Sequence, residues 1–518
     1  MYTLTDTARA GIAALAALAL AWNGFVKKRR STGTLPLPPG PTPLPIIGNV
    51  RGIDVNTPWI SYAEWGAVYG GLVYSRLFGL EIIIVNSEKI ARDLLDLRSR
   101  NYSNRPEFPT NELIGLDFNT VLLPYSATWR LHRRIFHQSF RQDAAHYYHP
   151  MQMKKAHQLL INIFNDPANY IAHLQTHSSS IIMSAAYDYD AAPSGDRLVS
   201  LIQKALRISS ELLRPEAAAV FSAFPSLLLL PAWFPGMKLK RQAALSKQYM
   251  AEWPEIPFQH VQQNMAAGTA APSMVCNFLK KIEGNDESNE LKKATKESAA
   301  TAFGAGSDTT TSTLHVFVMA MVLFPHVQER AQAVIDSVTG ENRLPSFGDR
   351  PAMPYIDAVF REVLRWYPVL PLAVAHNASS DDVYNGFLIP KGASLVPNLW
   401  AMSRNEDKYP NASEFNPERF LTAEGELTDD TVSFAWGFGR RICPGRHLAD
   451  ASLWSAMVSL LATFNFTKAR DSEGNPIGFE PQWIAGVTLR PRPFPCEISP
   501  RSKDMNLDTL TQLIGSNE

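Results

Sequence analysis

The chain has 518 residues, of which 45% are hydrophobic, so it can bury a large core in one domain or several, and wholesale disorder is excluded. Lys plus Arg and Asp plus Glu both number 49, which argues against a nucleic-acid partner because such a protein needs a basic field. Three cysteines are too few for a disulfide framework or a cysteine-rich zinc site, so the main body is expected in a reducing compartment.

The first 30 residues combine an apolar stretch with a basic cluster. Residues 10–26 carry no charge, and Lys27-Lys28-Arg29-Arg30 follow at once. A membrane-spanning helix needs about 20 apolar residues, so this stretch is at the short limit. A cleavable signal peptide is the alternative, but its positive charge precedes the apolar region. The order found here favours an uncleaved signal anchor over residues 1–30, with the rest of the chain in the cytosol.

Residues 35–45 are dense in proline, which suits either a partner-binding polyproline site or a stiff spacer. Their place after the predicted anchor favours a proline-rich hinge over residues 31–48. No repeat, low-complexity stretch or second linker follows residue 50, so we predict one domain over residues 49–518.

Periodicity predicts that this domain is mainly α-helical with small β-sheets. β-Branched residues between 71 and 85 predict two short strands, and residues 372–400 and 477–498 again have the pattern of short strands and turns. Helical patterns predominate from about 86 to 365, with examples at 151–164, 197–213, 325–338 and 353–366.

An apolar, aromatic run covers residues 224–236, and Lys238, Lys240 and Arg241 follow it. Prolines interrupt the run, so it is too short to span a bilayer. Core packing is the default explanation, whereas tryptophan flanked by basic residues is typical of a membrane-interface contact.

The predicted helix over residues 298–324 is interrupted by Gly304-Ala305-Gly306-Ser307-Asp308-Thr309-Thr310-Thr311. Glycine and threonine are poor helix formers, and an acid is unfavourable in an apolar helix. One explanation is a threonine-rich helix whose hydroxyls bond to preceding carbonyls. The other is functional: small residues let a flat ring approach the backbone, the hydroxyl bonds dioxygen, and the carboxylate relays protons.

Glu362 and Arg365 stand three residues apart on one face of a predicted helix, which suits an ion pair. Most such pairs are exposed and contribute little to stability. The apolar residues around this one favour partial burial.

The most informative run is Trp436-Gly437-Phe438-Gly439-Arg440-Arg441-Ile442-Cys443-Pro444-Gly445. Its glycines allow close approach of the backbone to a flat group and positive φ angles. Backbone N–H groups aimed at Cys443 and the start of a following helix stabilise a thiolate. Such a thiolate is a candidate axial ligand of haem iron. The alternative is a buried structural cysteine in a tight loop.

These residues resemble the haem-binding signature of the cytochrome P-450 superfamily, Phe-x-x-Gly-x-Arg-x-Cys-x-Gly. Gly439, Arg441, Cys443 and Gly445 match it, whereas Trp436 stands where the family usually has phenylalanine. The resemblance implies the cytochrome P-450 fold and haem b (iron protoporphyrin IX), with Cys443 as the axial ligand of the iron. The Trp436 indole N–H is a candidate donor to the thiolate or a neighbouring carbonyl. A bond to the sulfur would weaken electron donation and raise the reduction potential.

The resemblance covers essentially the whole chain and assigns roles to the other motifs. Thr309 and Asp308 match the oxygen-activation motif, as the hydroxyl that organises proton supply to dioxygen and its acidic neighbour. Side chains that hold the haem propionates are implied at Trp129, Arg133, His376 and Arg441. A structural, non-catalytic network that supports the haem side of the fold is implied at Glu362, Arg365 and Arg419.

As an enzyme, the chain is similar to microsomal class II members, in particular fungal secondary-metabolite monooxygenases, and would insert one oxygen atom into a small hydrophobic substrate. Electrons would come from NADPH through NADPH–cytochrome P-450 reductase, with cytochrome b5 as a further candidate partner. Arg440 and Arg446 are candidate contacts for the reductase. The implied location is the endoplasmic reticulum membrane, with a single-pass anchor and a second lipid contact at residues 224–236 beside the substrate entrance.

Two other classes of haem protein share the cysteine loop. A haem-thiolate isomerase or peroxygenase keeps the cysteine but can dispense with the acid and the threonine. A non-catalytic haem sensor needs neither a proton relay nor a substrate channel. The presence of Asp308 and Thr309 favours monooxygenation.

Overall fold

The computed structural model describes residues 35–212, 220–282, 288–340, 343–484, 486 and 488–515. The predicted signal anchor, residues 1–30, lies outside these residues, as does the first part of the predicted hinge. The rest of the hinge has isolated bridges that join Leu44 to Gly48 and Gly48 to Leu77. Within the described ranges, no single helix is long and apolar enough to cross a membrane. One pair passes that test together, Asn289–Leu323 with Pro325–Thr339, and it is bent by 104°.

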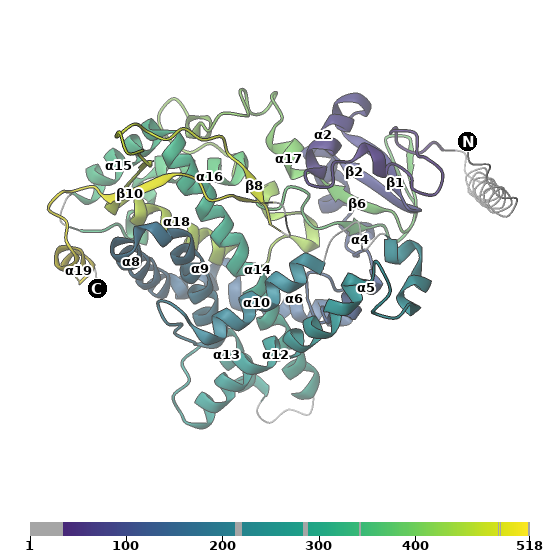
Figure 1. Ribbon diagram of the computed structural model, residues 1–518, viewed down its shortest axis with the longest axis horizontal. Helices are drawn as coiled ribbons and strands as arrows, with labels where there is room; N and C mark the ends of the chain where they lie inside the picture. The colour runs from purple at the N-terminus through teal and green to yellow at the C-terminus, as the bar shows by residue number, and fades with distance from the viewer. Residues whose placement is uncertain are drawn as a thin grey trace, which may run out of the picture.

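Helices form most of the molecule and surround the 36-residue helix α14 (Ser288–Leu323) (Figure 1). α14 packs against α6 (Ala127–Phe140), α9 (Tyr170–Tyr187), α13 (Met274–Ile282) and α18 (Arg446–Thr463). The other long helices are α2 (Pro58–Tyr69), α8 (His149–Asn165), α10 (Arg197–Leu212), α12 (Lys238–Ala266), α15 (Pro325–Thr339) and α16 (Pro354–Trp366). The short helices are α3 (Glu88–Ala91), α4 (Ser99–Tyr102), α5 (Pro109–Ile114), α7 (Gln142–Ala145), α17 (Leu399–Ser403) and α19 (Leu507–Gly515).

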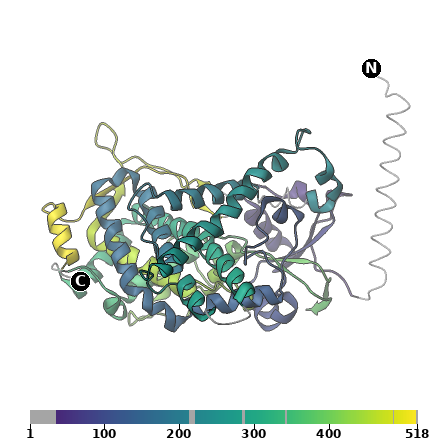
Figure 2. The same cartoon turned by 90° about the horizontal axis from the view of Figure 1, so that it is seen from below.

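A four-stranded sheet lies at one end of the molecule, opposite the C-terminal helix α19 (Figure 1, Figure 2). Its order is β1 (Leu72–Leu77), β2 (Leu80–Val85), β6 (Ser394–Pro397), β3 (His376–Asn377). β1 and β2 form an antiparallel hairpin, β6 runs parallel to β2, and β3 runs antiparallel to β6 with His376 opposite Leu395. The sheet therefore fixes His376 beside segments from both halves of the chain.

Three two-stranded sheets complete the fold. They are β4 (Asp382–Tyr384) with β5 (Phe387–Ile389), β7 (Phe464–Lys468) with β10 (Cys496–Pro500), and β8 (Trp483–Ile484) with β9 (Arg490–Pro491). The predicted mainly helical fold with small sheets is confirmed. The four predicted helices correspond to α8, α10, α15 and α16. The strands fall in the three predicted regions except β7, which lies in none of them, and the last two residues of β10.

The long helix α14 passes through two hydrophobic clusters. Its buried residues between 294 and 303 belong to a cluster with α9, α10, α12 and α13. Its residues 314–322 belong to a second cluster with α15, α16 and α18. The glycine- and threonine-rich interruption lies between these clusters, where the helix leaves one core before it enters the other. Asp308 and Thr309 are only half-buried there, whereas Ser307, Thr310 and Thr311 are buried. The acid thereby escapes full burial in apolar surroundings, which would be unfavourable.

Candidate functional site

The Cys443 loop is shaped by glycine and by the segment around residue 95. Gly437 has a φ of +81° and Gly439 a φ of +56°, which glycine adopts without strain. A Cβ atom at Gly439 would lie 2.0 Å from the carbonyl oxygen of Leu95. The Gly439 N–H donates to the Asp96 carboxylate at 2.5 Å. Only glycine fits at position 439, because a side chain would displace the backbone of the neighbouring segment.

Cys443 lies between the loop and the start of α18. Its N–H donates to the carbonyl of Trp436 at 2.8 Å, which closes the loop. Burial raises the pKa of the Cys443 thiol, while the Gly445 N–H and the charges of Arg133 and Arg446 oppose the rise. Burial thus outweighs the Gly445 N–H and the two arginine charges. A metal cation bound to the sulfur would deprotonate the thiol outright.

Trp436 ends the 3₁₀-helix η8 (Ser433–Trp436) and packs on the larger hydrophobic cluster. In the part of the chain that the structure describes, its indole N–H donates to no acceptor, the Cys443 sulfur included. The contact between the two residues is made instead by the Trp436 carbonyl. The predicted indole bond to the thiolate is therefore absent from this structure.

Arg441 and Trp129 form a stacked pair beside the loop. The Arg441 guanidinium lies 4.2 Å from the centre of the Trp129 ring. It donates to the carbonyls of Ser103 and Leu123, both at 2.8 Å. Trp129 lies on α6, one helical turn before Arg133, so the two predicted propionate donors point from the same face of one helix.

Arg105 belongs to the same region, although no sequence motif predicts its place there. It is 6% exposed and donates at 2.7 Å to the carbonyls of Val374 and Ala375. The next residue in that strand region is His376, whose Nδ1 donates to the carbonyl of Tyr102 at 2.7 Å. A single arginine in a loop has no spacing pattern, and only the tertiary contacts place it here.

The four basic side chains Arg105, Arg133, Arg441 and His376 repel one another, and we call them the basic cluster. Burial lowers the pKa of Arg133 to about 10, and burial together with the Arg133 charge lowers the pKa of Arg441 to about 9. Burial and the Arg441 charge hold the pKa of Arg105 well below its usual range. Burial and the Arg105 charge do the same for the pKa of His376.

The basic cluster has no carboxylate partner in the described ranges. Arg105, Arg441 and His376 donate to backbone carbonyls. The Arg133 guanidinium has no hydrogen-bond partner among those residues. A ligand that carries carboxylates fits this donor set, since charge-assisted bonds would offset the repulsion. With Cys443 as a metal-binding thiolate nearby, the residues present fit a haem with its two propionates.

The interruption of α14 presents an open face. Ala305 is exposed, and Asp308 and Thr309 are half-buried, although both flanking parts of the helix are buried. The Thr309 hydroxyl donates to the Ala305 carbonyl at 2.7 Å, and Thr311 and Thr313 bond to preceding carbonyls in the same way. This is the carbonyl bonding that the first explanation of the motif predicted, found on a helix face that is also open.

Asp308 is bonded to a different part of the chain. Its carboxylate accepts from the Thr488 hydroxyl at 2.6 Å, and its other oxygen lies 3.9 Å from the Arg490 guanidinium. Asp308 and Thr309 are thus adjacent but engaged with separate partners. Neither contact could be predicted from the sequence, because Thr488 lies 180 residues after Asp308 and shares no motif with it.

The acid–hydroxyl segment, the cysteine and the basic cluster lie on neighbouring helices. α14 packs against α18, which follows Cys443, and against α6, which carries Trp129 and Arg133. The structure therefore brings the separate sequence motifs to one region of the fold.

Glu362, Arg365 and Arg419 also come together, in a different environment. Both oxygens of the Glu362 carboxylate accept from Arg365, at 2.6 and 2.7 Å, and one also accepts from Arg419 at 3.2 Å. Glu362 and Arg365 are fully buried. Arg365 donates further to the carbonyls of Ser403 and Ala412, both at 2.8 Å. The network joins α16 to the segment that precedes the cysteine loop and touches none of the basic cluster.

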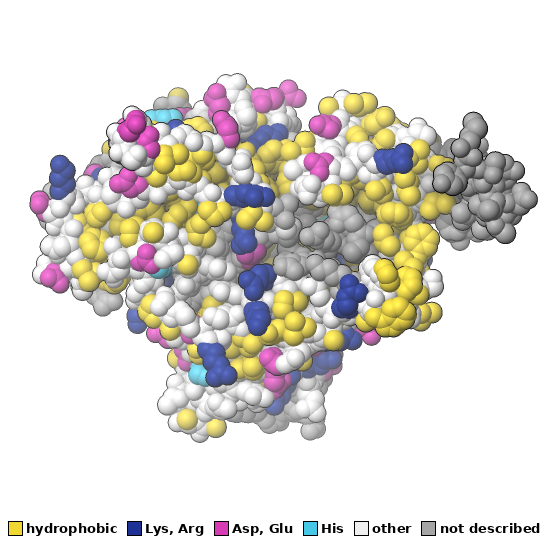
Figure 3. Space-filling view, viewed as in Figure 1, with side chains coloured by type: hydrophobic (Ala, Val, Ile, Leu, Met, Phe, Trp, Pro, Cys, Tyr) yellow, Lys and Arg dark blue, Asp and Glu magenta, His cyan; other side chains and the backbone are white. Residues whose placement is uncertain are grey.

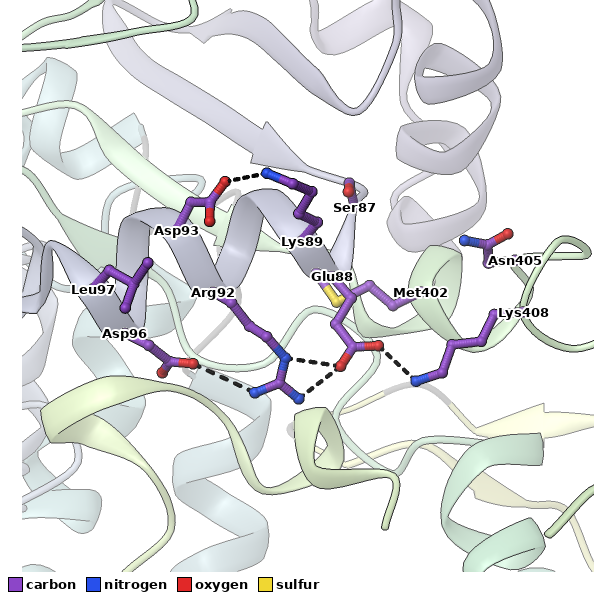
Figure 4. A pocket seen from close by; sticks show the side chains of 10 residues that line it. All are labelled: Ser87, Glu88, Lys89, Arg92, Asp93, Asp96, Leu97, Met402, Asn405 and Lys408. Carbon is purple, nitrogen blue, oxygen red and sulfur yellow. Dashed lines mark hydrogen bonds and ion pairs between the residues drawn. The ribbon is translucent and has the colours of Figure 1, made fainter. Parts of the chain in front are cut away.

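A pocket of about 620 Å³ opens behind the cysteine loop, lined by charged side chains of residues 88–96 and by Lys408 (Figure 4). These charges are paired: Lys89 with Asp93 at 2.8 Å, and Glu88 with both Arg92 and Lys408. Leu97 and Met402 are the apolar residues of this lining, and the charged side chains around them neutralise one another.

The run at residues 224–236 lies at the surface. Leu229 is 84% exposed and Trp233 is 76% exposed. Lys240 and Arg241 fold back and donate to carbonyls of this segment. Other exposed apolar side chains occur near the β1–β2 lobe, at Leu44, Ile46 and Val68, where Figure 3 shows apolar side chains gathered.

Comparison with known proteins gives one consistent family. A sequence model of the cytochrome P-450 family matches residues 38–497. The cytochrome P-450 monooxygenase claR of Ampulloclitocybe clavipes is 37% identical over 483 residues, which cover 92% of this chain and 89% of claR. The cytochrome P-450 monooxygenase ple1 of Rhodocybe pseudopiperita is 37% identical over 506 residues, or 96% of each protein. The cytochrome P-450 monooxygenase ppsD of Aspergillus oryzae is 37% identical over 495 residues, which cover 92% of this chain and 91% of ppsD.

Proposed function

Because this chain belongs to the cytochrome P-450 family and is a monooxygenase, we propose that its reaction runs at a haem b whose iron is bound by Cys443. The family implies a haem cofactor, a redox partner and a substrate. The observation that carries the residue assignment is the basic cluster, which is buried beside Cys443 without a carboxylate partner among the described residues.

Trp129, Arg133, His376 and Arg441 hold the haem propionates in this proposal, and Arg105 joins them. Gly439 and Trp436 shape the backbone under the ring. The bound haem supplies the reductive cleavage of dioxygen, which thiolate donation favours. One oxygen atom enters a C–H bond of the substrate, and the other leaves as water after two electrons and two protons arrive.

Thr309 and Asp308 supply those protons. The Thr309 hydroxyl donates to the Ala305 carbonyl, and a rotation about its Cβ–Oγ1 bond turns the proton away from that carbonyl toward the open face. Asp308 accepts from Thr488, so its carboxylate is held at the edge of that face and can pass protons from solvent.

NADPH–cytochrome P-450 reductase is the proposed electron donor, with cytochrome b5 as a second candidate. Arg440 is exposed at the cysteine loop and donates to the Tyr125 hydroxyl at 2.6 Å, which suits contact with an acidic protein surface. Arg446 is turned inward and donates to the Cys443 carbonyl, so it supports the loop more than the partner surface.

The proposed location is the endoplasmic reticulum membrane, through the anchor at residues 1–30 and a second contact at residues 224–236. The exposed Leu229 and Trp233 support the second contact. The proposed substrate is a small hydrophobic molecule of secondary metabolism. Fractionation of tagged full-length protein and of a variant that lacks residues 1–30 tests the location; recovery of full-length protein in the soluble fraction would refute it.

A reduced-CO difference spectrum tests haem-thiolate ligation. We expect the thiolate-type Soret band in the purified protein and its loss in Cys443→Ser, in which the hydroxyl is a poor iron ligand. Product analysis after co-expression with the reductase then separates the classes. Oxygen-18 in the product from labelled dioxygen, dependent on NADPH, marks a monooxygenase. A rearranged product without label marks an isomerase, and label from hydrogen peroxide alone marks a peroxygenase.

A further inference from the structure

The helix α14 carries a notch at Gly304 that a tryptophan from another helix fills. A Cβ atom at Gly304 would lie 2.5 and 2.6 Å from two ring carbons of Trp253, and 3.3 Å from a methyl carbon of Leu206. Trp253 is fully buried, so its ring cannot move aside into solvent. Only glycine at position 304 allows the indole to lie directly on the helix backbone.

Three elements meet around this notch. Trp253 comes from α12, Leu206 from α10, and Phe118 from the loop before α6. The Phe118 ring meets the Trp253 ring edge to face, with centroids 5.8 Å apart and an interplanar angle of 89°. Phe118 and Leu206 are half-buried, whereas Trp253 has no exposed surface. Trp253 therefore lies behind the half-buried side chains of Phe118 and Leu206 and supports them. We call these three side chains the wall.

This wall stands next to the open face of α14. Gly304 precedes Asp308 by four residues, so the two lie on one stripe of the helix, and exposed Ala305 follows Gly304 directly. The notch is thus one turn before the acid–hydroxyl pair. A ligand that contacts Ala305 and Thr309 meets the wall when it extends toward the N-terminal end of α14.

The pairing is unfavourable for stability at both positions. Glycine in a helix interior destabilises the helix relative to alanine. The buried Trp253 N–H has no hydrogen-bond partner among the described residues. Pro254 and Pro257 lie inside α12 beside it, where each lacks the N–H of a normal helical residue. Gly304 and Trp253 are each unfavourable for stability on their own, and a role in shaping the neighbouring space would account for their presence.

We infer that Trp253, seated in the Gly304 notch, is a specificity-determining residue that limits the depth of the substrate space beside α14 and restricts the enzyme to compact substrates. The inference rests on the proposed function, because it needs the substrate space to lie on the open face of α14.

Azole ligands test this without knowledge of the natural substrate, since they bind haem iron through a ring nitrogen and shift the Soret band. The probes are imidazole, which is small, and clotrimazole, which is bulky. In Trp253→Leu we expect the ratio of imidazole Kd to clotrimazole Kd to rise about tenfold, because the lost ring opens volume beside the notch. The imidazole Kd itself should change by less than about twofold, since imidazole does not reach the wall.

Trp454→Leu is the matched control. Trp454 is also fully buried with an unpartnered N–H among the described residues, but it lies on α18 against Phe347. The ratio should stay at the wild-type value in this variant. The inference would be overturned if the Kd ratio rose equally in Trp253→Leu and Trp454→Leu, or if it did not rise in Trp253→Leu. If Trp253→Leu fails to retain haem, Trp253→Phe carries the same comparison with a smaller expected rise.

A second measurement tests the contact itself. Gly304→Ala should lower the melting temperature, and the double variant with Trp253→Leu should lose less than the sum of the two single effects, because the shortened side chain relieves the clash. If the losses in melting temperature were additive, the contact between Trp253 and Gly304 would be refuted. Absence of any azole-induced Soret shift in the wild-type protein would refute the haem proposal and the specificity role with it. A normal shift with an unaltered ratio refutes the specificity role alone.

Discussion

Two buried groups of arginines in this molecule differ in what neutralises them. Arg365 and Arg419 share the carboxylate of Glu362, so the protein itself supplies the counter-charge. Arg105, Arg441 and His376 donate to backbone carbonyls, and Arg133 has no hydrogen-bond partner among the described residues. Mutual repulsion adds to burial in lowering the pKa values of this cluster. The first group is complete without a ligand, whereas the second gains stability only from an added anion. The difference separates a structural network from a binding site more clearly than the presence of arginine does.

The largest effect on the free energy of unfolding is expected when Glu362 no longer neutralises Arg365 and Arg419. Glu362→Gln leaves Arg365 buried and charged without its partner, which should lower the free energy of unfolding by about 3–5 kcal/mol. Glu418→Gln is the control, since Glu418 pairs with Arg330 at the surface and its loss should cost less than about 1 kcal/mol. Urea unfolding followed by circular dichroism measures both. Equal losses in the two variants would contradict the buried role of Glu362.

Arg133→Leu should affect haem binding and leave the stability of the haem-free protein intact. Removal of a half-buried cation that has no partner among the described residues should leave the unfolding free energy of the haem-free protein unchanged or raised. Haem affinity should fall by about 10- to 100-fold, since a hydrogen bond to a charged group is worth about 1.5–3 kcal/mol. Haem transfer to excess apomyoglobin measures the affinity. Arg134→Leu, the exposed neighbour on α6, should leave it unaltered.

His376 should give the basic cluster a pH dependence. Its folded-state pKa lies below the unfolded value of about 6.5, so below that pH the unfolded chain binds a proton that the folded protein excludes. Stability should therefore fall as pH drops from 6.5, by up to about 1.4 kcal/mol per pH unit from this group, and His376→Gln should remove that part. Unfolding at pH 7 and 5.5, with and without haem, measures it.

Bound propionates should weaken this acid sensitivity, because their negative charge stabilises protonated His376. His177 is the control: burial lowers its pKa to about 4, and it lies against the Lys155 carbonyl on α8. The contribution of His177 to the pH dependence of stability should be the same with and without haem. If haem weakened the acid sensitivity contributed by His177 as much as that contributed by His376, the placement of propionates beside His376 would be contradicted.

A small change in stability is expected at Thr309, outside both arginine groups. Thr309→Ala removes one hydroxyl bond to a carbonyl, which is worth less than about 1 kcal/mol. The fraction of NADPH electrons recovered in product should nevertheless fall, because the proton supply loses its hydroxyl. Thr313→Ala removes the same kind of bond one turn later and should keep the wild-type coupling. Unchanged coupling in Thr309→Ala would remove Thr309 from the proposed role.

Motifs with fixed local spacing could be predicted from the sequence, and contacts between distant segments could not. Glu362 and Arg365 lie on one helical turn, and the glycines around Cys443 define the loop, so both features follow from local patterns. Arg105 gave no signal, because its burial depends on carbonyls near residue 375. The Trp436 indole was a candidate donor to the thiolate or a neighbouring carbonyl, but sequence spacing sets no side-chain direction. The Trp436 backbone carbonyl makes the contact with Cys443 instead. The Asp308 partners were missed for the same reason.

The bond between Gly439 and Asp96 has a consequence for the order of synthesis. The two residues are 343 positions apart, so the loop around Cys443 has no finished shape until a segment made early meets one made near the end. At about 5–20 residues per second on the ribosome, Asp96 precedes Gly439 by roughly 20–70 s. During that interval the early segment is exposed without its partner. The loop that carries Cys443 can therefore take its final shape only late in the synthesis of the chain.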